Sequence, residues 1–279
     1  MTGAVKACVI GWPIEHSRSP LIHGHWLERH GIEGSYDKVA VAPDNLKDFL
    51  GSLAAKGYSG LNVTVPHKEA ALRLADEADE AARAVGAANT LWLEDGKLMA
   101  SNTDVYGFVT HLDETAPGWD GEDRPVCVLG AGGATRAILK GLIDRGFSEI
   151  RLTNRTRDRA ESLANEFGAA ITVYDWEDRQ GALEGCGLLI NATSLGMTGS
   201  PPLEIDLSPM RAEGVVADIV YAPLETALLR QARERGLKPI DGLGMLLHQA
   251  VPGFEKWFGV RPEVTDELRS RIVADLEAS

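Results

Sequence analysis

Short apolar runs and longer amphipathic stretches alternate along the chain, most regularly in its second half. Six apolar runs there have the length and composition of buried strands: 126–129, 149–153, 170–173, 188–190, 215–219 and 238–240. Three stretches between them have helical character: 133–145, 157–167 and 224–235. Strands that alternate with helices in this way predict a parallel sheet that is covered by helices on both faces.

The first half is less regular but also mixes strands and helices. Apolar runs predict strands at 4–11, 38–41, 60–65, 90–94 and 97–100, the last two joined as a hairpin by Asp95-Gly96. Helices are predicted over 44–56, 68–85 and 103–114, and from Ser19, as N-cap, to a stop at Gly31. Two C-terminal helices, 243–258 and 263–277, precede no further strand, so we expect them to pack back on the first domain.

Residues 115–125 are dense in Gly, Pro and acidic side chains and form the clearest break in the chain. A length of 279 residues fits two domains. Hydrophobic residues make up 44% of the chain and charged residues 25%, as in an ordinary globular protein. The formal net charge of -13 argues against nucleic-acid and anionic-membrane partners.

Several protein classes are disfavoured by what the chain lacks. No apolar run is long enough to cross a bilayer, and the N-terminus lacks a signal-peptide pattern. Three cysteines without C-x-x-C spacing argue against a disulfide framework, and the seven histidines lack metal-ligand spacing. We therefore expect a reduced, cytoplasmic protein without a metal site.

A glycine-rich turn follows the strand at 126–129. It comprises Gly130, Ala131, Gly132, Gly133 and Ala134 and opens a helix. Such a turn lets backbone N–H groups approach a pyrophosphate at the positive end of the helix dipole. Because Thr135 stands where the third glycine of G-x-G-x-x-G belongs, a tight turn without a ligand is the competing interpretation.

The residues after the next strand favour the ligand. An acidic residue at this point would bind the ribose 2′-hydroxyl of NAD, whereas arginine accommodates the 2′-phosphate of NADP. Here Asn154 is followed by Arg155, Thr156, Arg157 and Arg159. Cations at a helix start oppose the dipole, so a solvated helix end explains them less well than a bound anion does. The sequence therefore predicts NADP.

Polar side chains also gather in the first half. Ser17 and Ser19 precede a helix, where two hydroxyls would suit a substrate carboxylate, although capping alone explains Ser19. Lys68 opens a helix after a strand, and Asp104 opens another, where an N-cap role is the competing interpretation. With Asn and Thr residues around them, Lys68 and Asp104 form a candidate acid–base pair in a polar pocket.

Eight segments, taken in order, resemble the shikimate dehydrogenase family. They are GWPIEHSRSP at 11–20, NVTVPHK at 62–68, GAANT at 86–90, NTD at 102–104, GAGGA at 130–134, NRT at 154–156, NATSLGM at 191–197 and GLGMLLHQ at 242–249. The resemblance spans about residues 5–260. It implies an α/β protein with a Rossmann-like NADP-binding domain, 105–240, and a discontinuous α/β substrate-binding domain, 1–104 with 241–279. It also implies reversible NADPH-dependent reduction of 3-dehydroshikimate to shikimate, a step of aromatic amino acid biosynthesis.

The resemblance also implies individual roles. Ser17 and Ser19 hold the substrate carboxylate, with Tyr221 nearby, while Lys68 and Asp104 are catalytic. The ring hydroxyls bind Asn62, Thr64, Asn89, Asp104 and Gln249. The cofactor contacts residues 130–134, Asn154, Arg155, Thr156, Arg159, Thr193, Ser194, Gly242 and Met245.

Two other functions stay open. One is a quinate/shikimate dehydrogenase with looser substrate choice, and the other is a nucleotide-binding regulatory module without turnover. Intact Lys68 and Asp104 argue against the second. Either a monomer or a homodimer is expected, with small molecules as the ligands.

Overall fold

The computed structural model describes residues 4–121 and 124–278. The chain divides into two units, one of Met1–Gly107 with Leu247–Ser279 and the other of Phe108–Leu246. The chain therefore passes between the units within α5 (Asp104–Thr115) and within α9 (Leu243–His248), and the break at 115–125 belongs to the second unit. Residues 122 and 123 of that break lie outside the described residues.

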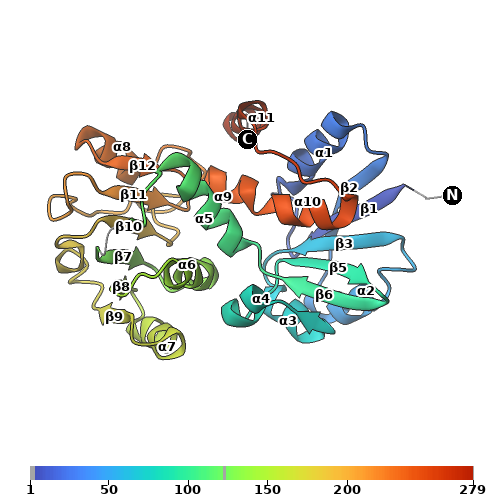
Figure 1. Cartoon of the computed structure of the whole chain (residues 1–279), viewed down its shortest axis with the longest axis horizontal. Helices are drawn as coiled ribbons and strands as arrows, with labels where there is room; N and C mark the ends of the chain where they lie inside the picture. Colours follow the sequence, from blue (N-terminus) through green and yellow to red (C-terminus); the bar gives the residue numbers. More distant parts are fainter. Residues whose placement is uncertain (1–3, 122–123, 279) are drawn as a thin grey trace. The chain divides into compact units, whose positions relative to one another are not determined.

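The second unit contains a six-stranded sheet in the order β12-β11-β10-β7-β8-β9 (Figure 1). Its strands are β7 (Val126–Leu129), β8 (Ile150–Thr153), β9 (Ile171–Tyr174), β10 (Leu188–Asn191), β11 (Val215–Asp218) and β12 (Lys238–Ile240). All neighbouring pairs are parallel, which confirms the prediction. The order reverses between β7 and β10, and ligands of such sheets bind at the carboxyl ends of the strands at this switch point.

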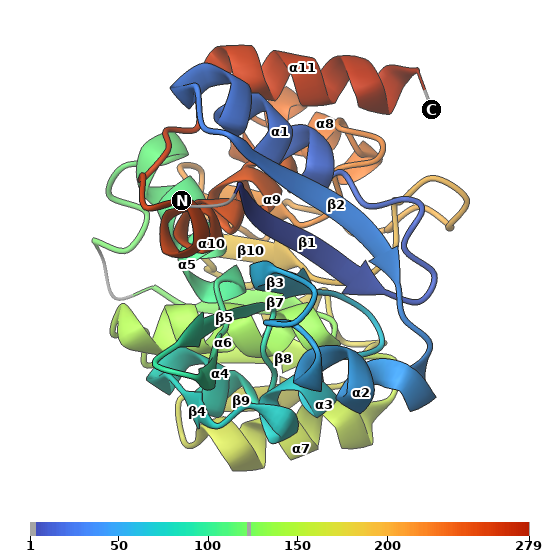
Figure 2. The same ribbon diagram turned by 90° about the vertical axis from the view of Figure 1, so that its right-hand side faces the viewer.

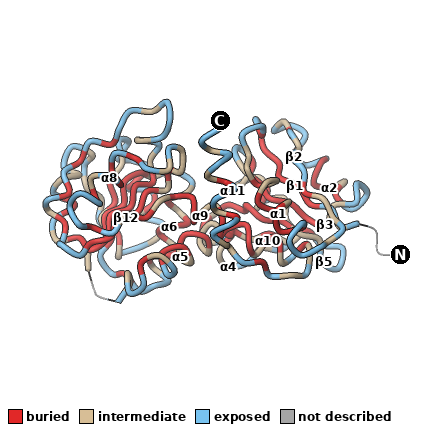
Figure 3. The backbone as a smooth tube through the Cα atoms, turned by 90° about the horizontal axis from the view of Figure 1, so that it is seen from above, coloured by how far each residue is buried: buried red, intermediate tan, exposed pale blue. Residues whose placement is uncertain are grey.

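Helices connect these strands, and apolar side chains cover both faces of the sheet. The helices are α5, α6 (Gly133–Asp144), α7 (Arg157–Phe167), α8 (Ala227–Glu234) and a 3₁₀ turn, Gly181–Leu183. Along β7, Val126 and Val128 join one hydrophobic cluster, while Cys127 and Leu129 join another. Successive side chains of a strand point to opposite faces, so a strand buried on both faces has a continuous apolar run. The central strands β7, β8, β10 and β11 are almost fully buried and belong to the red part of the second unit in Figure 3, whereas the edge strands β9 and β12 are only partly buried.

The first unit is built on a mixed sheet in the order β2-β1-β3-β5-β6-β4. Its strands are β1 (Val5–Gly11), β2 (Gly34–Ala40), β3 (Tyr58–Val63), β4 (Glu77–Ala78), β5 (Thr90–Glu94) and β6 (Lys97–Ser101). Strand β1 lies parallel to both β2 and β3 (Figure 2), whereas β5 is antiparallel to β3 and β6. The predicted hairpin at Asp95-Gly96 is confirmed, with φ values of 51° and 79° that suit its tight turn.

The helices of the first unit come from both ends of the chain. They are α1 (Ser19–His30), α2 (Leu46–Gly51) after a 3₁₀ turn at Pro43–Asn45, α3 (Lys68–Leu74), α4 (Glu80–Val85), α10 (Ala250–Phe258) and α11 (Asp266–Glu277). Helix α10 packs on β1, β3 and β5, and α11 packs on α1, as predicted for the C-terminal helices. The Trp257 indole in α10 donates to the Leu91 carbonyl over 2.9 Å.

Three helix predictions were wrong in detail. The stretch 68–85 is broken, because the Asp76 carboxylate accepts the Leu98 backbone N–H and β4 pairs with β6. Asp79 then caps α4 by accepting from Ala82 N. The stretch 243–258 is likewise divided into α9 and α10 at Gln249, and only Leu46–Gly51 of 44–56 forms an α-helix.

Candidate active site

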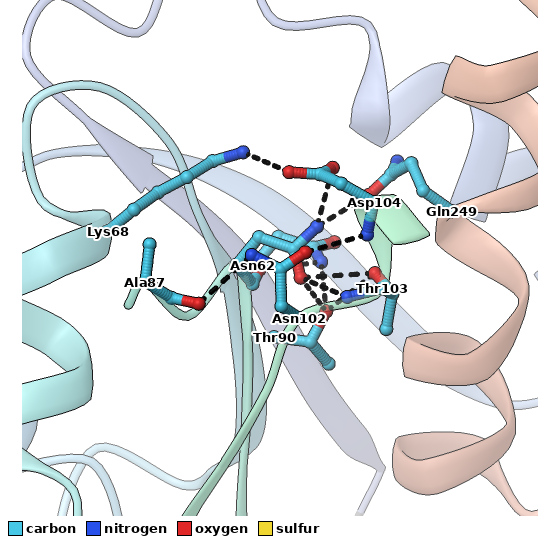
Figure 4. A network of polar contacts seen from close by, with 9 residues as sticks. Asn62, Lys68, Ala87, Thr90, Asn102, Thr103, Asp104 and Gln249 are labelled. Atoms are coloured by element: carbon cyan, nitrogen blue, oxygen red, sulfur yellow. Dashed lines mark hydrogen bonds and ion pairs between the residues drawn. The ribbon is translucent and has the colours of Figure 1, made fainter. Parts of the chain in front are cut away.

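A lysine–carboxylate pair lies at the centre of a polar network in the first unit (Figure 4). Lys68 begins α3 just after β3, and Asp104 begins α5 just after β6. Lys68 Nζ lies 2.6 Å from Asp104 Oδ2, and the two side chains are 31% and 14% exposed. The other carboxylate oxygen, Oδ1, accepts from Asn89 Nδ2 over 2.9 Å. The carboxylate thus holds an ammonium group that is still within reach of a ligand.

The competing N-cap role of Asp104 is not observed. Asp104 is the first residue of α5, and its backbone N–H donates to Asn102 Oδ1 over 3.1 Å. Asn102 is itself anchored, because its Nδ2 donates to the Ala87 carbonyl. A neighbouring amide therefore takes the local structural task, and the Asp104 carboxylate is available to Lys68.

Amide side chains extend the network from the pair into the sheet. Asn89 Nδ2 also lies 3.4 Å from Oε1 of Gln249, the residue that caps α10. Asn62, at the end of β3, donates to the Asn89 carbonyl and to Thr90 Oγ1, both over 3.1 Å. Four residues predicted to bind ring hydroxyls are therefore brought together: Asn62, Asn89, Asp104 and Gln249. The first two are at most 5% exposed, which gives them a fixed geometry.

The two serines do not have the local roles that the sequence predicts. Arg18 occupies the N-cap position of α1, so Ser19 is not the cap but the first helical residue. Ser17, for which the sequence gives no local structural role, accepts the Ser19 backbone N–H through its Oγ over 3.3 Å. Thr64 follows β3, is half-buried and donates its backbone N–H to the Ile10 carbonyl.

In the second unit, the glycine turn lies at the carboxyl end of β7, beside the switch point. Thr135 replaces the third glycine and supports the turn: its hydroxyl donates to the Gly130 carbonyl and accepts from Gly132 N. A Cβ built at Gly132 or Gly133 meets nothing within 4 Å, and both residues are exposed. The turn therefore has a supported shape and an open outer side at the start of α6, which fits a pyrophosphate.

Gly130 and Gly132 should respond differently to a methyl group. Gly130 has φ of +105°, and a Cβ there would lie 2.8 Å from the Ala192 carbonyl oxygen. We expect Gly130→Ala to lower the free energy of unfolding by about 2 kcal/mol. Gly132→Ala, in open space, should leave the thermal midpoint unchanged but weaken NADPH binding, measured by fluorescence titration. An unchanged midpoint for Gly130→Ala would contradict the close approach.

The three arginines after β8 are in different situations. The Arg157 guanidinium is already held by two ion pairs, with Glu161 and Asp175, each over 2.7 Å. Arg155 and Arg159 are exposed and have no ion-pair partner in the described part of the chain. Asn154 links this segment to the glycine turn: its Oδ1 accepts from Ala131 N, and its Nδ2 donates to the Thr156 carbonyl. Arg155 and Arg159 thus follow, along the chain, the asparagine that is bonded to the turn, which fits a 2′-phosphate.

A second loop borders the glycine turn at the switch point. Asn191 ends β10, and its Oδ1 accepts from both N and Oγ1 of Thr193. A Cβ at Gly130 would lie 3.0 Å from Thr193 Cγ2, so this loop and the glycine turn are in contact. Ser194, next to it, is exposed. The loop is therefore placed to line a bound cofactor.

Asp218, which the sequence did not single out, supports this loop from β11. It is 2% exposed and accepts from Asn191 Nδ2, Thr226 Oγ1 and Val220 N. Burial raises its pKa, although these hydrogen bonds act in the opposite direction. Its buried contacts make it a support for the loop.

Three other predicted site residues follow β11 and β12. Gly242 approaches the backbone so closely that a Cβ would lie 2.1 Å from the Ile219 carbonyl oxygen. Met245 packs against the hydrophobic cluster that Ala131 also contacts. Tyr221 is half-buried in the loop after β11 and does not belong to the Lys68–Asp104 network.

Sequence reasoning missed the groups that support the predicted residues. Tyr36, Thr90 and Thr103 hydrogen-bond the site amides, as Thr135 does the glycine turn. Within residues 4–121 and 124–278, no three His, Cys, Asp or Glu residues are arranged to hold a metal ion. None of the helices described is both long and apolar enough to span a membrane.

Comparisons with known proteins agree with this geometry. Residues 9–91 match the model of the shikimate dehydrogenase substrate binding domain, 115–197 that of shikimate / quinate 5-dehydrogenase, and 242–266 that of the shikimate 5′-dehydrogenase C-terminal domain. Shikimate dehydrogenase (NADP(+)) of Azorhizobium caulinodans is 55% identical over 98% of this chain and 97% of its own.

Two solved structures extend the comparison. Shikimate 5-dehydrogenase of Thermus thermophilus, in complex with NADP(H) and shikimate, is 34% identical, with a TM-score of 0.84 over 98% of this chain and 99% of that one. Quinate dehydrogenase of Corynebacterium glutamicum, in complex with NAD, is 30% identical, with a TM-score of 0.90 over 97% and 99% of the two chains.

The sheet order, the supported glycine turn and the lysine–carboxylate pair define a dinucleotide-dependent oxidoreductase. Several family models and relatives that match over nearly the whole chain then make the assignment specific. The chain belongs to the shikimate dehydrogenase family.

Proposed function

We propose that this protein catalyses the reversible, NADPH-dependent reduction of 3-dehydroshikimate to shikimate. The observation that carries the proposal is the Lys68–Asp104 pair, which is surrounded by amides that can hydrogen-bond ring hydroxyls. A relative that is 55% identical and is named shikimate dehydrogenase (NADP(+)) supports both the substrate and the cofactor. Substrate binding belongs to segments 1–104 and 241–279, and NADP binding to 105–240.

NADPH supplies the hydride that reduces the carbonyl carbon. The Lys68 ammonium donates a proton to the carbonyl oxygen, and in the reverse direction the neutral amine takes the hydroxyl proton. Asp104 holds Lys68 in place through Oδ2 and, together with Asn89, orients the reacting hydroxyl. General acid–base help of this kind contributes roughly 10²–10⁴-fold.

The remaining side chains orient the ring. Ser17 and Ser19 bind the substrate carboxylate, with Tyr221 assisting, while Asn62, Thr64, Asn89 and Gln249 bind the hydroxyls. The pyrophosphate would be held by residues 130–134, and the adenosine ribose and its phosphate by Asn154, Arg155, Thr156 and Arg159. The nicotinamide would be lined by Thr193, Ser194, Gly242 and Met245.

A spectrophotometric assay tests the proposal directly. We expect NADPH to form when the protein is mixed with shikimate and NADP⁺. When NAD⁺ replaces NADP⁺, NADH should form more slowly, because Arg155 and Arg159 favour the phosphate. NADPH binding without turnover would instead support a regulatory module.

The second candidate function is quinate oxidation, favoured by the 0.90 TM-score with a quinate dehydrogenase. That enzyme is described with NAD, whereas Arg155 and Arg159 of this chain fit a phosphate. Comparing kcat/KM for shikimate and quinate decides between them, and a ratio near one would support a dual enzyme.

We also propose that the protein is cytoplasmic and that its cysteines are reduced. Cys8, Cys127 and Cys186 are free and buried, and burial raises the pKa of the Cys8 thiol to about 12. Buried thiols that stay protonated are unreactive, so none of the three cysteines depends on an oxidising compartment.

We propose a monomer or a homodimer, which light scattering of the purified protein distinguishes.

A further inference from the structure

A buried tyrosine lies beneath the substrate-side amides and has no part in the mechanism described so far. Tyr36 is on β2, is 7% exposed and donates its hydroxyl to Asn62 Oδ1 over 2.5 Å. Its ring stacks on His23, with centroids 3.9 Å apart and planes inclined by 11°. Burial lowers the pKa of His23 to about 3, so a neutral ring holds the phenol in place.

The orientations of the two amides beyond Tyr36 are fixed by backbone groups. Asn62 Nδ2 faces the Asn89 carbonyl, which can only accept, so Oδ1 must face Tyr36. Asn89 Oδ1 faces the Thr103 backbone N–H, which can only donate, so Nδ2 must face Asp104. The Tyr36 hydroxyl is therefore the donor to Asn62.

One hydroxyl joins the two amides. Thr90 Oγ1 accepts from Asn62 Nδ2 over 3.1 Å and donates to Asn89 Oδ1 over 3.0 Å. The donors thus run in one direction from Tyr36 through Asn62, Thr90 and Asn89 to Asp104 Oδ1. Hydrogen bonds in such a chain polarise one another, and buried members are costly to leave unpaired.

We propose that Tyr36 is a positioning residue for the reaction, which acts through Asn62 and Thr90 on Asn89 and the Asp104 carboxylate. The inference rests on the proposed function, because it assigns Asp104 and Asn62 to the substrate. The Ser19 side chain opposes the rise in the Tyr36 pKa that burial causes.

Removing the Tyr36 hydroxyl leaves Asn62 Oδ1 buried without its donor. The amide then regains a donor if the neighbouring His23 ring, whose nitrogens have no hydrogen-bond partner among the described residues, shifts toward it. It also does so by turning, which would place its NH₂ group against the apolar ring and take the donor away from the Asn89 carbonyl. Either arrangement loosens the chain that ends on Asp104. The effect should therefore fall on the chemical step and on the substrate, whereas NADP⁺ binding in the other unit should not change.

The test is Tyr36→Phe in the full chain, with Tyr58→Phe as the matched control. Tyr58 is a half-buried tyrosine on β3 whose ring contacts Phe49 and which lies outside the network. We expect Tyr36→Phe to lower kcat/KM for shikimate on the order of tenfold, with an unchanged KM for NADP⁺. Tyr58→Phe should match the wild type. Unchanged kcat and KM for shikimate in Tyr36→Phe would overturn the inference.

A double-mutant cycle separates positioning from simple loss of packing. If Tyr36 acts through Asn62, Tyr36→Phe should have almost no further effect on kcat in an Asn62→Ala background. Additive losses would overturn the inference. Thr90→Val, which breaks the next link at nearly constant volume, should reproduce the Tyr36→Phe pattern and keeps the test valid if Tyr36→Phe folds poorly.

The activity of the wild type separates the proposed function from the role of Tyr36. A wild type that does not oxidise shikimate refutes the proposed function and, with it, this role of Tyr36. An active wild type whose Tyr36→Phe and Thr90→Val variants are equally active refutes the role of Tyr36 alone.

Discussion

Lys68→Ala is expected to lower kcat for shikimate oxidation by roughly 10²–10⁴-fold, the usual contribution of a positioned acid–base group. The ammonium lies 2.6 Å from Asp104 Oδ2 while 31% of its side chain stays exposed, so it is both oriented and accessible. Alanine provides no proton donor, and water entering the gap would be less well oriented. The measurement is steady-state kinetics in both directions, together with fluorescence titration of NADPH, whose dissociation constant should not change.

Lys97→Ala is the matched control for this prediction. Lys97 also pairs with a carboxylate in the first unit, at 2.5 Å from Glu77, but the two side chains are 57% and 49% exposed. Exposed pairs contribute about 0–1 kcal/mol, so kcat should be unaffected and stability nearly so. Near-normal turnover by Lys68→Ala would remove this lysine from the mechanism, whatever its contact with Asp104.

The features that the sequence predicted best are those with local causes. A continuous apolar run suffices to identify β7, because both faces of that strand are covered. The Asp95-Gly96 turn carries its own backbone preference, which its positive φ values satisfy. Lys68 and Asp104 could be paired as candidates because each opens a helix beside a strand end, where polar groups converge.

The features that the sequence did not predict depend on partners far along the chain. Strand β2 begins at Gly34, four residues before the predicted start, because edge strands tolerate the polar side chains of Ser35 and Asp37. The helix predicted over 68–85 stops because Asp76 meets Leu98 across the sheet. Tertiary hydrogen bonds overrule local helix propensity in such cases.

Within the site, too, locally signalled residue types were predicted, whereas contacts between distant residues were not. Tyr36 lies outside the strand predicted at 38–41, and only its bond to Asn62, 26 positions away, reveals its place in the network. Ser19 was predicted as the N-cap of the first helix, but Arg18 takes that position. Residue types that suit a chemistry can be read from the sequence, whereas the groups that orient them require the fold.

The arginines after β8 provide the second large expected effect. Replacing Arg155 and Arg159 together by alanine should weaken NADPH binding by about 10²–10³-fold and NADH binding by much less. The reason is that a charge-assisted hydrogen bond contributes about 1.5–3 kcal/mol, and only NADPH carries the 2′-phosphate that would accept it. Titrating both cofactors against the wild type and the variant measures the ratio directly.

Arg157→Ala controls for the loss of positive charge at this helix start. Its guanidinium already lies 2.7 Å from both Glu161 and Asp175, so it has less to offer a phosphate than its two neighbours. We expect its removal to change the preference for NADPH over NADH only slightly. Salt should weaken NADPH binding more in the wild type than in the double variant, because the double variant has fewer positive charges for salt to screen. An equal loss for NADPH and NADH in the double variant would show that the two arginines hold a part of the cofactor other than its 2′-phosphate.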